Sequence, residues 1–384
     1  MPSRSTSFVR VACAMSLVTV LSVLSSPADA QDAGRAGGRG GRGGRGSQTV
    51  ITDTARAREL FVSNRHEDHR QANFDQQIQQ RLVAESTTVA RSRGVLQYTN
   101  VKYKSSVDGM EIPASLYQPL QKRGARGHAA MVWVHGGVHG SWWSYRLFPF
   151  VKEAIQRGYV IIAPEYRGST GFGAAHYNAI DYGGKELDDV ASAVEYLKTL
   201  PHVDPERIGI MGWSHGGYIA SLLLFREQHP FKAGAAMVPV SNLVFRLGYK
   251  GPGYQWQFST QKEVLGLPHE KKELYIERSP LYHVEKLKVP ILVHVATNDT
   301  DVDYVEDQQL VWKLRALKPD LAETKIYVDP VPGPSSAGHT FNRRVNPDTW
   351  ERDDSPDQID SWNRTWTFFD WWLRPYEDRS KARM

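Results

Sequence analysis

The sequence has a single cysteine, Cys13, among its 384 residues, and it has no apolar run of about 18 residues that could span a bilayer. Its charge is nearly balanced, since 47 Lys and Arg stand against 42 Asp and Glu. Aromatic residues make up 11 % and charged residues 23 %, unlike the aromatic-poor, highly charged composition of disordered chains. These features exclude a disulfide-built domain, a transmembrane span and a wholly disordered chain, and they predict one or two globular domains that fold in water.

The first 30 residues have the pattern of a secretory signal peptide. Two arginines precede an apolar stretch over residues 11–24, and a small-residue triplet ends at Ala30. We expect cleavage after Ala30 and export as a secreted or periplasmic protein, with Cys13 lost in the signal. The mature chain then has no cysteine, so its core alone must stabilise the fold.

Residues 31–49 are predicted to be a disordered linker rich in glycine and arginine. Residues 31–46 contain eight Gly and four Arg, and no large apolar side chain offsets the entropy that ordering would cost. This stretch contributes a net charge of +3 and the signal +1, which leaves +1 of the total of +5 for residues 47–384. The folded part is therefore almost neutral, and we predict a solvated tether and no nucleic-acid partner.

Residues 50–94 are predicted to form an N-terminal helical extension. Apolar residues recur there at loosely helical spacing among many Arg, Gln and Glu, which is typical of one or two amphipathic helices. His66 and His69 are three residues apart and would share a helix face, but no third metal ligand is near them in sequence. We interpret both as solvent-facing residues and predict no metal site.

From residue 95 to 384 the sequence alternates between short apolar runs and helical patterns. A strand, turn, strand pattern comes first, over residues 98–104 and 112–117. Six apolar runs follow, separated by helix patterns: residues 129–134, 159–163, 208–211, 233–238, 290–296 and 324–328. This alternation predicts an α/β protein with a doubly wound, mainly parallel sheet, helices on both faces and an N-terminal antiparallel hairpin.

The pentapeptide GWSHG at residues 212–216 matches the Gly-x-Ser-x-Gly pattern of a nucleophile elbow. It follows an apolar run that ends at Met211 and precedes a helical stretch over residues 218–225. Such a turn holds the serine backbone in a strained conformation that only small neighbours permit, and it lifts the hydroxyl clear of the sheet. The helix N-terminus behind the serine favours developing negative charge. Ser214 is therefore the predicted nucleophile.

A serine nucleophile needs a histidine base, and the base needs a carboxylate that orients it. In α/β-hydrolases these follow the serine in the order Asp, His, each in a loop after a strand. Asp299 comes just after an apolar run, and His339 is the only histidine beyond the candidate acids. We therefore predict Asp299 as the acid and His339 as the base. Asp301 and Asp303 remain alternatives for the acid.

Backbone N–H groups are predicted to bind the oxyanion of the tetrahedral intermediate. One belongs to His215, the residue after the nucleophile, and the other comes from the loop after the third strand. That loop contains His135-Gly136-Gly137, and we assign the second donor to Gly137 because glycine lets the backbone approach the substrate. The ring of His135 is an alternative donor, and orientation of the loop is an equally weighted role for that residue.

Together these residues resemble the catalytic domain of the prolyl oligopeptidase family of serine peptidases, over roughly residues 95–373. Four segments carry the resemblance: residues 134–140, 166–173, 204–218 and 279–302. The second, YRGSTGFG, is the most discriminating, because a generic esterase does not need it. The resemblance implies an α/β-hydrolase fold and the roles of nucleophile, acid and base for Ser214, Asp299 and His339. It implies no metal or organic cofactor.

Two departures limit what the resemblance implies. Family peptidases usually carry a long propeller domain that gates the site, and fewer than seventy residues lie between the predicted signal and the catalytic domain here. Val138 stands where many relatives have proline, and His135 where some have an oxyanion-binding tyrosine. Size selection and anchoring of a substrate amine are therefore not implied, so the family alone does not decide between peptides and esters.

Residues 242–282 form a predicted cap-like insertion over the active site. Its Tyr254 and Trp256, with Trp142 and Trp143 after the glycine loop, are predicted to form an aromatic substrate pocket. A small satellite core under a long loop is the alternative interpretation.

The sequence thus predicts an exported serine hydrolase that cleaves peptide or amide bonds through an acyl-enzyme at Ser214. A carboxylesterase that uses the same triad on aryl or feruloyl esters is the alternative. A non-catalytic envelope-binding protein that acts through its Arg-Gly segment is a third hypothesis. The expected partner is a small peptide or ester, with no integral membrane contact, and the oligomeric state is not defined.

Overall fold

The computed structural model describes residues 72–142, 144–250, 254, 258, 266, 268–331 and 337–381. The predicted signal peptide, the linker and residues 50–71, with His66 and His69, lie outside the described residues, as do Trp143 and Trp256. Among the described residues, no helix combines the length and the apolar character that crossing a bilayer requires.

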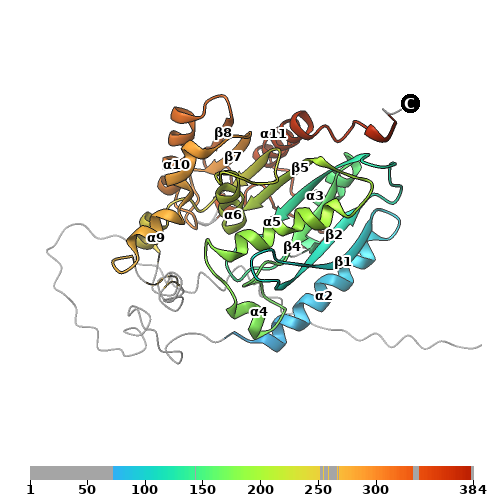
Figure 1. The fold of residues 1–384 in the computed structure, drawn as a ribbon, viewed down its shortest axis with the longest axis horizontal. Helices are drawn as coiled ribbons and strands as arrows, with labels where there is room; N and C mark the ends of the chain where they lie inside the picture. The colour runs from blue at the N-terminus through green and yellow to red at the C-terminus, as the bar shows by residue number, and fades with distance from the viewer. Residues whose placement is uncertain are drawn as a thin grey trace, which may run out of the picture. The chain divides into compact units, whose positions relative to one another are not determined.

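An eight-stranded sheet forms the centre of the fold, with the strand order β1-β2-β4-β3-β5-β6-β7-β8 (Figure 1). The hairpin of β1 (Gln97–Lys104) and β2 (Glu111–Gln118) is antiparallel, and β2 pairs antiparallel with β4 (Val160–Pro164). All other neighbours are parallel; these strands are β3 (His128–Val134), β5 (Val203–Trp213), β6 (Gly234–Met237), β7 (Ile291–Ala296) and β8 (Ala322–Tyr327). The predicted mainly parallel sheet with an N-terminal antiparallel hairpin is confirmed.

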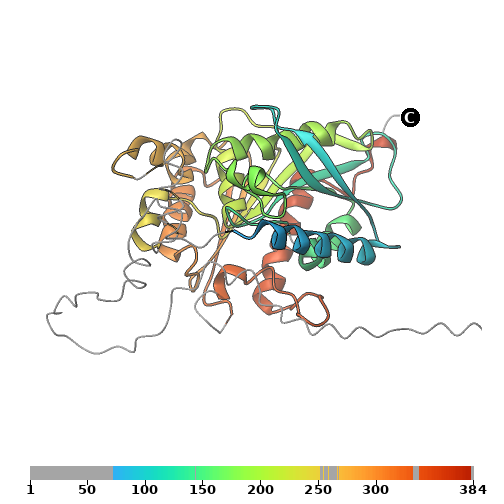
Figure 2. The same cartoon turned by 90° about the horizontal axis from the view of Figure 1, so that it is seen from below.

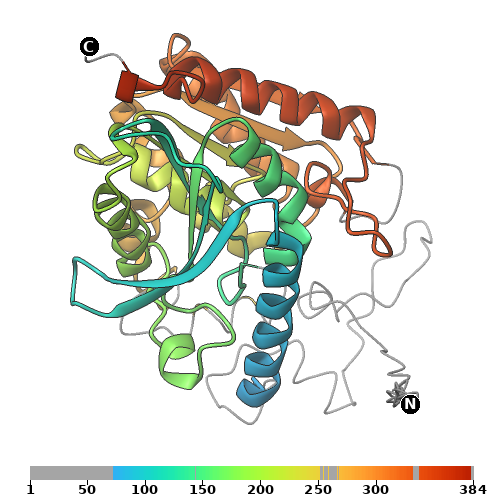
Figure 3. The ribbon, with the colours of Figure 1, turned by 90° about the vertical axis from the view of Figure 1, so that its right-hand side faces the viewer.

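Helices cover both faces of this sheet. On one face lie α5 (Lys185–Lys198), α6 (His215–Leu224) and α10 (Tyr304–Leu317), and on the other α3 (Ser144–Gln156) and α11 (Pro356–Leu373) (Figure 3). Alternate residues of β3 enter the two cores, so that Val132 packs on the α6 side and Trp133 on the α11 side. A strand buried on both faces needs apolar residues at every position, which explains the continuous apolar run in the sequence.

The other helices of the described residues precede, connect or follow the strands of the sheet. They are α2 (Phe74–Ser92), α4 (Ala174–Asn178), α7 (Leu243–Tyr249), α9 (Lys272–Glu277) and the 3₁₀ turns η3 (Pro280–Lys286), η4 (Ala337–Thr340) and η5 (Arg379–Lys381). Of these, α2 is the described part of the predicted N-terminal extension, and it packs against α3 and β1 (Figure 2). Arg81 of α2 donates to the Gly171 carbonyl oxygen at 2.8 Å and stacks over the Phe172 ring at 4.9 Å.

Arg167 ties three parts of the fold together in a buried ion-pair network. Its guanidinium donates to both carboxylate oxygens of Asp189 in α5, at 2.8 Å each, and to Asp108 in the β1–β2 turn at 2.9 and 3.0 Å. Asp189 is fully buried and Arg167 almost so. The hydrogen bonds to Asp189 and Asp108 therefore compensate for the hydration that the Arg167 guanidinium loses on burial.

Replacing Asp189 by Asn should lower the free energy of unfolding by about 3 kcal/mol, because it leaves the Arg167 charge buried without its main partner. Urea unfolding followed by tryptophan fluorescence measures the change. Lys102→Ala is the matched control, since it breaks the exposed Lys102–Glu111 pair of 2.6 Å, which should contribute less than about 1 kcal/mol. Equal losses for the two variants would contradict the importance of the buried network.

Candidate active site

Ser214 lies in the sharp turn between β5 and α6, at the carboxyl edge of the parallel strands. Its backbone has φ +56° and ψ −119°, a strained conformation for a residue with a side chain. A Cβ on Gly212 would collide with the Gly216 carbonyl oxygen, and one on Gly216 with that of Val134, so both positions require glycine. The Ser214 N–H donates to the Met237 carbonyl oxygen of β6 at 2.9 Å, which ties the turn to the sheet.

The loops after β7 and before α11 bring Asp299 and His339 together. Nδ1 of His339 lies 2.7 Å from Oδ2 of Asp299, whose side chain is buried. The other Asp299 oxygen accepts two backbone N–H groups of its own loop, at 2.9 and 3.0 Å. Gly338 permits the close approach, because a Cβ there would collide with Oδ1 of Asn298. The carboxylate is thus held in place by its own loop, and it fixes one nitrogen of the histidine.

The two rival acids have different positions. Oδ2 of Asp301 lies 3.2 Å from Nε2 of His339, and its other oxygen pairs with Lys250. Asp303 instead caps α10 by accepting the Val305 N–H at 2.9 Å. Ser214 and His339, both among the described residues, make no hydrogen bond to each other, and Asp301 faces the histidine nitrogen that a base presents to serine. Within the described ranges, no group of three or more His, Cys, Asp or Glu is arranged to hold a metal ion.

The loop His135-Gly136-Gly137 lies beside the nucleophile. A Cβ on Gly136 would lie 3.1 Å from Cβ of Ser214, and Gly137 has a φ of +76°. Both ring nitrogens of His135 are used around this loop, with Nδ1 3.0 Å from the Gly136 carbonyl oxygen and Nε2 2.8 Å from Oγ of Ser169. Burial lowers the pKa of His135 to about 3, so the ring is neutral. This arrangement fits a role in orienting the loop, one of the two interpretations drawn from the sequence.

His215 is the first residue of α6, so its N–H has no partner inside the helix and can donate to an oxyanion. Its imidazole is buried, with Nε2 3.6 Å from Oε1 of Glu186, and neither ring nitrogen is hydrogen-bonded to a described residue. Burial lowers the pKa of this ring to about 3. The backbone of His215, rather than its side chain, is therefore the group that can serve the site.

A positive charge that the sequence analysis did not predict lies beside the glycine loop next to the nucleophile. Nη1 of Arg343 lies 3.5 Å from the position a Cβ on Gly136 would take, the same position that is 3.1 Å from Cβ of Ser214. Its side chain makes no hydrogen bond or ion pair with any other described residue. Burial lowers the pKa of Arg343, and the carboxylates of Asp301 and Asp299 oppose this shift. The only signal in the sequence is its position, four residues after His339 in the same loop.

The aromatic residues predicted to bind substrate lie in two different clusters. The Tyr254 hydroxyl lies 2.6 Å from that of Tyr182, accepts a bond from Nε of Arg246 at 2.8 Å, and its ring packs 5.1 Å from Phe258. Trp142 is 3 % exposed, belongs to the core on the α11 side, and its indole N–H donates to the Tyr117 hydroxyl at 2.9 Å. The structure therefore does not bring Tyr254 and Trp142 together in one pocket.

Glu165, at the end of β4, is a buried carboxyl group next to the glycine loop. Oε1 accepts the Trp142 N–H at 2.9 Å and the Ser141 hydroxyl at 3.2 Å, and Oε2 lies 3.4 Å from Nε2 of His135. Burial raises the pKa of Glu165 to about 8. At neutral pH the carboxyl group is protonated and its contact with the neutral His135 carries no net charge.

This raised pKa predicts a pH dependence of stability. Between about pH 4.5 and 8 the unfolded chain loses the Glu165 proton and the folded chain keeps it, so the free energy of unfolding falls as the pH rises. Glu165→Gln removes this loss, and we expect the stability of the variant relative to the wild type to rise by on the order of 3 kcal/mol over that range. Urea unfolding at pH 5, 6.5 and 8 tests it. Because other groups titrate alike in both proteins, a difference that does not change with pH would contradict the assignment.

Comparison of the sequence with known proteins places the chain in a family. The sequence model of the Prolyl oligopeptidase family matches residues 144–362, more than half of the chain. The chain belongs to the prolyl oligopeptidase family. The predicted family resemblance and the α/β-hydrolase fold are thereby confirmed.

Two curated relatives show how much of such proteins the chain covers. It is 30 % identical over 243 residues to the Uncharacterized peptidase YuxL of Bacillus subtilis (strain 168), which is 62 % of this chain and 35 % of that protein. It is 32 % identical over 186 residues to the Dipeptidyl aminopeptidase BIII of Pseudoxanthomonas mexicana, 47 % of this chain and 27 % of the relative. The chain spans about a third of the length of these family relatives.

Among solved structures, the acylaminoacyl peptidase of Pyrococcus horikoshii is similar with a TM-score of 0.60. The match covers 76 % of this chain and 44 % of that one, at 23 % sequence identity. At this identity the likeness concerns the fold alone.

Proposed function

We propose that this member of the prolyl oligopeptidase family is a serine hydrolase that cleaves peptide or amide bonds through an acyl-enzyme at Ser214. The observation that carries the proposal is the strained turn that presents Ser214 beside Gly136, at the strand edge where Asp299 holds His339. This arrangement matches the requirement for a nucleophile, a base and an orienting acid from three loops. Family membership favours an amide substrate over an ester.

The proposed reaction has two stages. The Ser214 Oγ forms a bond to the substrate carbonyl carbon, and His339 takes the hydroxyl proton and gives it to the leaving amine as the amide bond breaks. Water then adds to the acyl-enzyme, His339 takes its proton, and the acid product leaves as the proton returns to Oγ. In both stages the backbone N–H groups of His215 and Gly137 stabilise the oxyanion.

The guanidinium of Arg343 is suited to stabilise the same negative charge. We expect Arg343→Gln to lower kcat/KM by about tenfold, less than the loss of a directly bonded oxyanion donor, because the charge acts across a short gap. Arg344→Gln is the matched control, since the neighbouring arginine pairs with Asp353 at 3.0 Å. Steady-state kinetics on one substrate compares the two variants. Equal activity of both would show that Arg343 does not act on the reaction.

The substrate class is tested by comparing kcat/KM on peptide and ester substrates. The names of the relatives direct the first choice, which is N-acyl amino acid and dipeptide p-nitroanilides, beside p-nitrophenyl and feruloyl esters. Hydrolysis of the anilides, with labelling of Ser214 by a fluorophosphonate probe, is the expected result. Ester hydrolysis without amidase activity would assign the carboxylesterase alternative to the same triad. Absence of labelling would leave the envelope-binding hypothesis.

We also propose export of the protein, on the support of the signal pattern over residues 1–30. N-terminal sequencing of the mature chain tests it, and we expect the first residue to be Gln31. A mature protein that still begins at Met1 would contradict export through this signal.

A further inference from the structure

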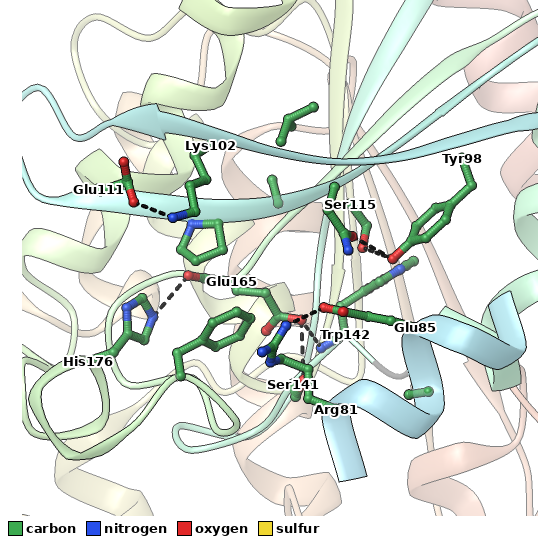
Figure 4. Close-up of a pocket in the computed structure, with 16 residues that line it drawn as sticks. Arg81, Glu85, Tyr98, Lys102, Glu111, Ser115, Ser141, Trp142, Glu165 and His176 are labelled. Atoms are coloured by element: carbon green, nitrogen blue, oxygen red, sulfur yellow. Dashed lines mark hydrogen bonds and ion pairs between the residues drawn. The ribbon is translucent and has the colours of Figure 1, made fainter. Parts of the chain in front are cut away.

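A pocket lies apart from the catalytic groups, between α2, the β1–β2 hairpin and the segments that follow β3 and β4. Its volume is about 580 Å³, and Figure 4 shows the labelled side chains around it. Phe172, Trp142 and Pro113 give it an apolar wall, and Glu165 lines it as well. The triad, the proposed oxyanion donors and Arg343 do not line this pocket, whereas Trp142, which the sequence predicts in a substrate pocket, does.

The other charged side chains of this pocket are already compensated. Arg81 pairs with Glu85 at 2.6 Å, and Lys102 pairs with Glu111 at 2.6 Å. His176 contributes no charge, since burial lowers its pKa and its Nε2 lies 3.1 Å from the backbone carbonyl oxygen of Glu165.

Glu165 is the exception. It is 94 % buried, and Figure 4 shows its carboxyl group near the centre of the pocket with bonds to Ser141 and Trp142. Its Oε2 has no hydrogen-bond partner among the described residues, and the nearby imidazole of His135 is neutral. A buried carboxyl group without a cation is costly to ionise, and a ligand that supplies the cation removes that cost.

We propose that this pocket binds a small organic cation, a primary ammonium group on an alkyl or aryl-alkyl body, with Glu165 as its counter-charge. The ammonium N–H groups supply donors for the carboxylate, and the apolar wall takes the hydrocarbon part. The stacking of the Arg81 guanidinium on Phe172 shows that an aromatic ring of this pocket already packs against a cation.

Binding has a definite proton balance. The empty site holds Glu165 as the neutral acid at pH 7, because burial raises its pKa to about 8. An ammonium ion stabilises the carboxylate, so one proton passes from Glu165 to the buffer for each cation bound. The charged group that acts on Glu165 is Glu85 of α2, and Glu85 is compensated by its pair with Arg81 at 2.6 Å. Well above pH 8 the carboxyl group is already ionised and the release disappears.

Isothermal titration calorimetry of the unmodified chain with phenethylammonium chloride tests the proposal at pH 7 and 9, in two buffers of different ionisation enthalpy at each pH. We expect one site, release of nearly one proton per cation at pH 7 and much less at pH 9. The neutral isostere phenethyl alcohol should bind at least about tenfold more weakly, since it lacks the charge. No turnover is involved, so the outcome is independent of the proposed hydrolase activity.

Two glutamate variants complete the test. Glu165→Gln should weaken phenethylammonium binding at least about tenfold and abolish proton release, whereas Glu111→Gln, at the compensated Lys102 pair, should bind within about twofold of the wild type. Absence of binding at millimolar cation, equal affinity for the neutral alcohol, or unchanged binding by Glu165→Gln would each overturn the proposal. The comparison of cation with alcohol uses only the wild type, so it does not depend on how either variant folds.

Discussion

Ser214→Ala should lower kcat on the best substrate by about six orders of magnitude, because no acyl-enzyme can form without the Oγ nucleophile. The activity that remains should still exceed the reaction in water, since the His215 and Gly137 N–H groups keep their positions. Labelling by a fluorophosphonate should be lost completely. Stability should change little, because alanine has the same Cβ and so the same strain at a φ of +56°.

Ser221→Ala is the matched control for this variant. Ser221 lies in α6, the helix that follows Ser214; it is fully buried, and its hydroxyl donates to the Gly217 carbonyl oxygen at 2.8 Å. It should keep both labelling and turnover. Labelling of the Ser214→Ala protein, or turnover by it at the wild-type rate, would remove the basis of the proposed mechanism.

The fold could be predicted from the sequence because its signals are local. The strands β3, β4 and β7 are buried on both faces, so each appears as a short continuous apolar run, and the helices between them keep their own periodicity, whereas the edge strand β8 is only partly buried. Strand ends were less well predicted. The apolar run at residues 208–211 is only part of β5, which begins at Val203 because that residue pairs with His128 of β3 before the register shifts.

The position of Ser214 could also be predicted from a local signal, because five consecutive residues determine the turn that strains its backbone. Trp142 and Tyr254 show the limit of such inference. Their chemistry suits a substrate pocket. Trp142 is instead hydrogen-bonded to the buried hydroxyl of Tyr117, 25 residues away, and Tyr254 to that of Tyr182, 72 residues away. Partners so distant in sequence leave no local pattern, and the same holds for the approach of Arg343 to Gly136.

The contacts of His339 distinguish its two neighbouring carboxylates. Asp299 meets Nδ1, the nitrogen that an orienting acid must hold, and Asp301 meets Nε2, the nitrogen that must receive the proton of Ser214. A carboxylate at Nε2 competes with Ser214 for this nitrogen in the resting site and must move away from it when substrate binds. The order of Asp299 and Asp301 along the loop does not distinguish these roles. The nitrogen of His339 that each carboxylate contacts does distinguish them.

Asp299→Asn should therefore lower kcat by about 10⁴-fold. The Asn side-chain oxygen can still accept the two backbone N–H groups of the loop, which leaves its NH₂ group facing Nδ1 of His339. That nitrogen then has to be an acceptor, the ring proton moves to Nε2, and the base cannot take a proton from Ser214. The fold should remain, because the hydrogen bonds of the loop are kept.

Asp301→Asn should change kcat by less than about tenfold, because Nδ1 keeps its acid and only a competitor of Ser214 is altered. Both variants are measured on one substrate at saturation, with urea unfolding as the check that each is folded. The reverse order of losses would make Asp301 the acid and would require His339 to turn its ring. Equal and large losses in folded proteins would mean that the two carboxylates act as a unit, so the double variant would then lose no more than either single one.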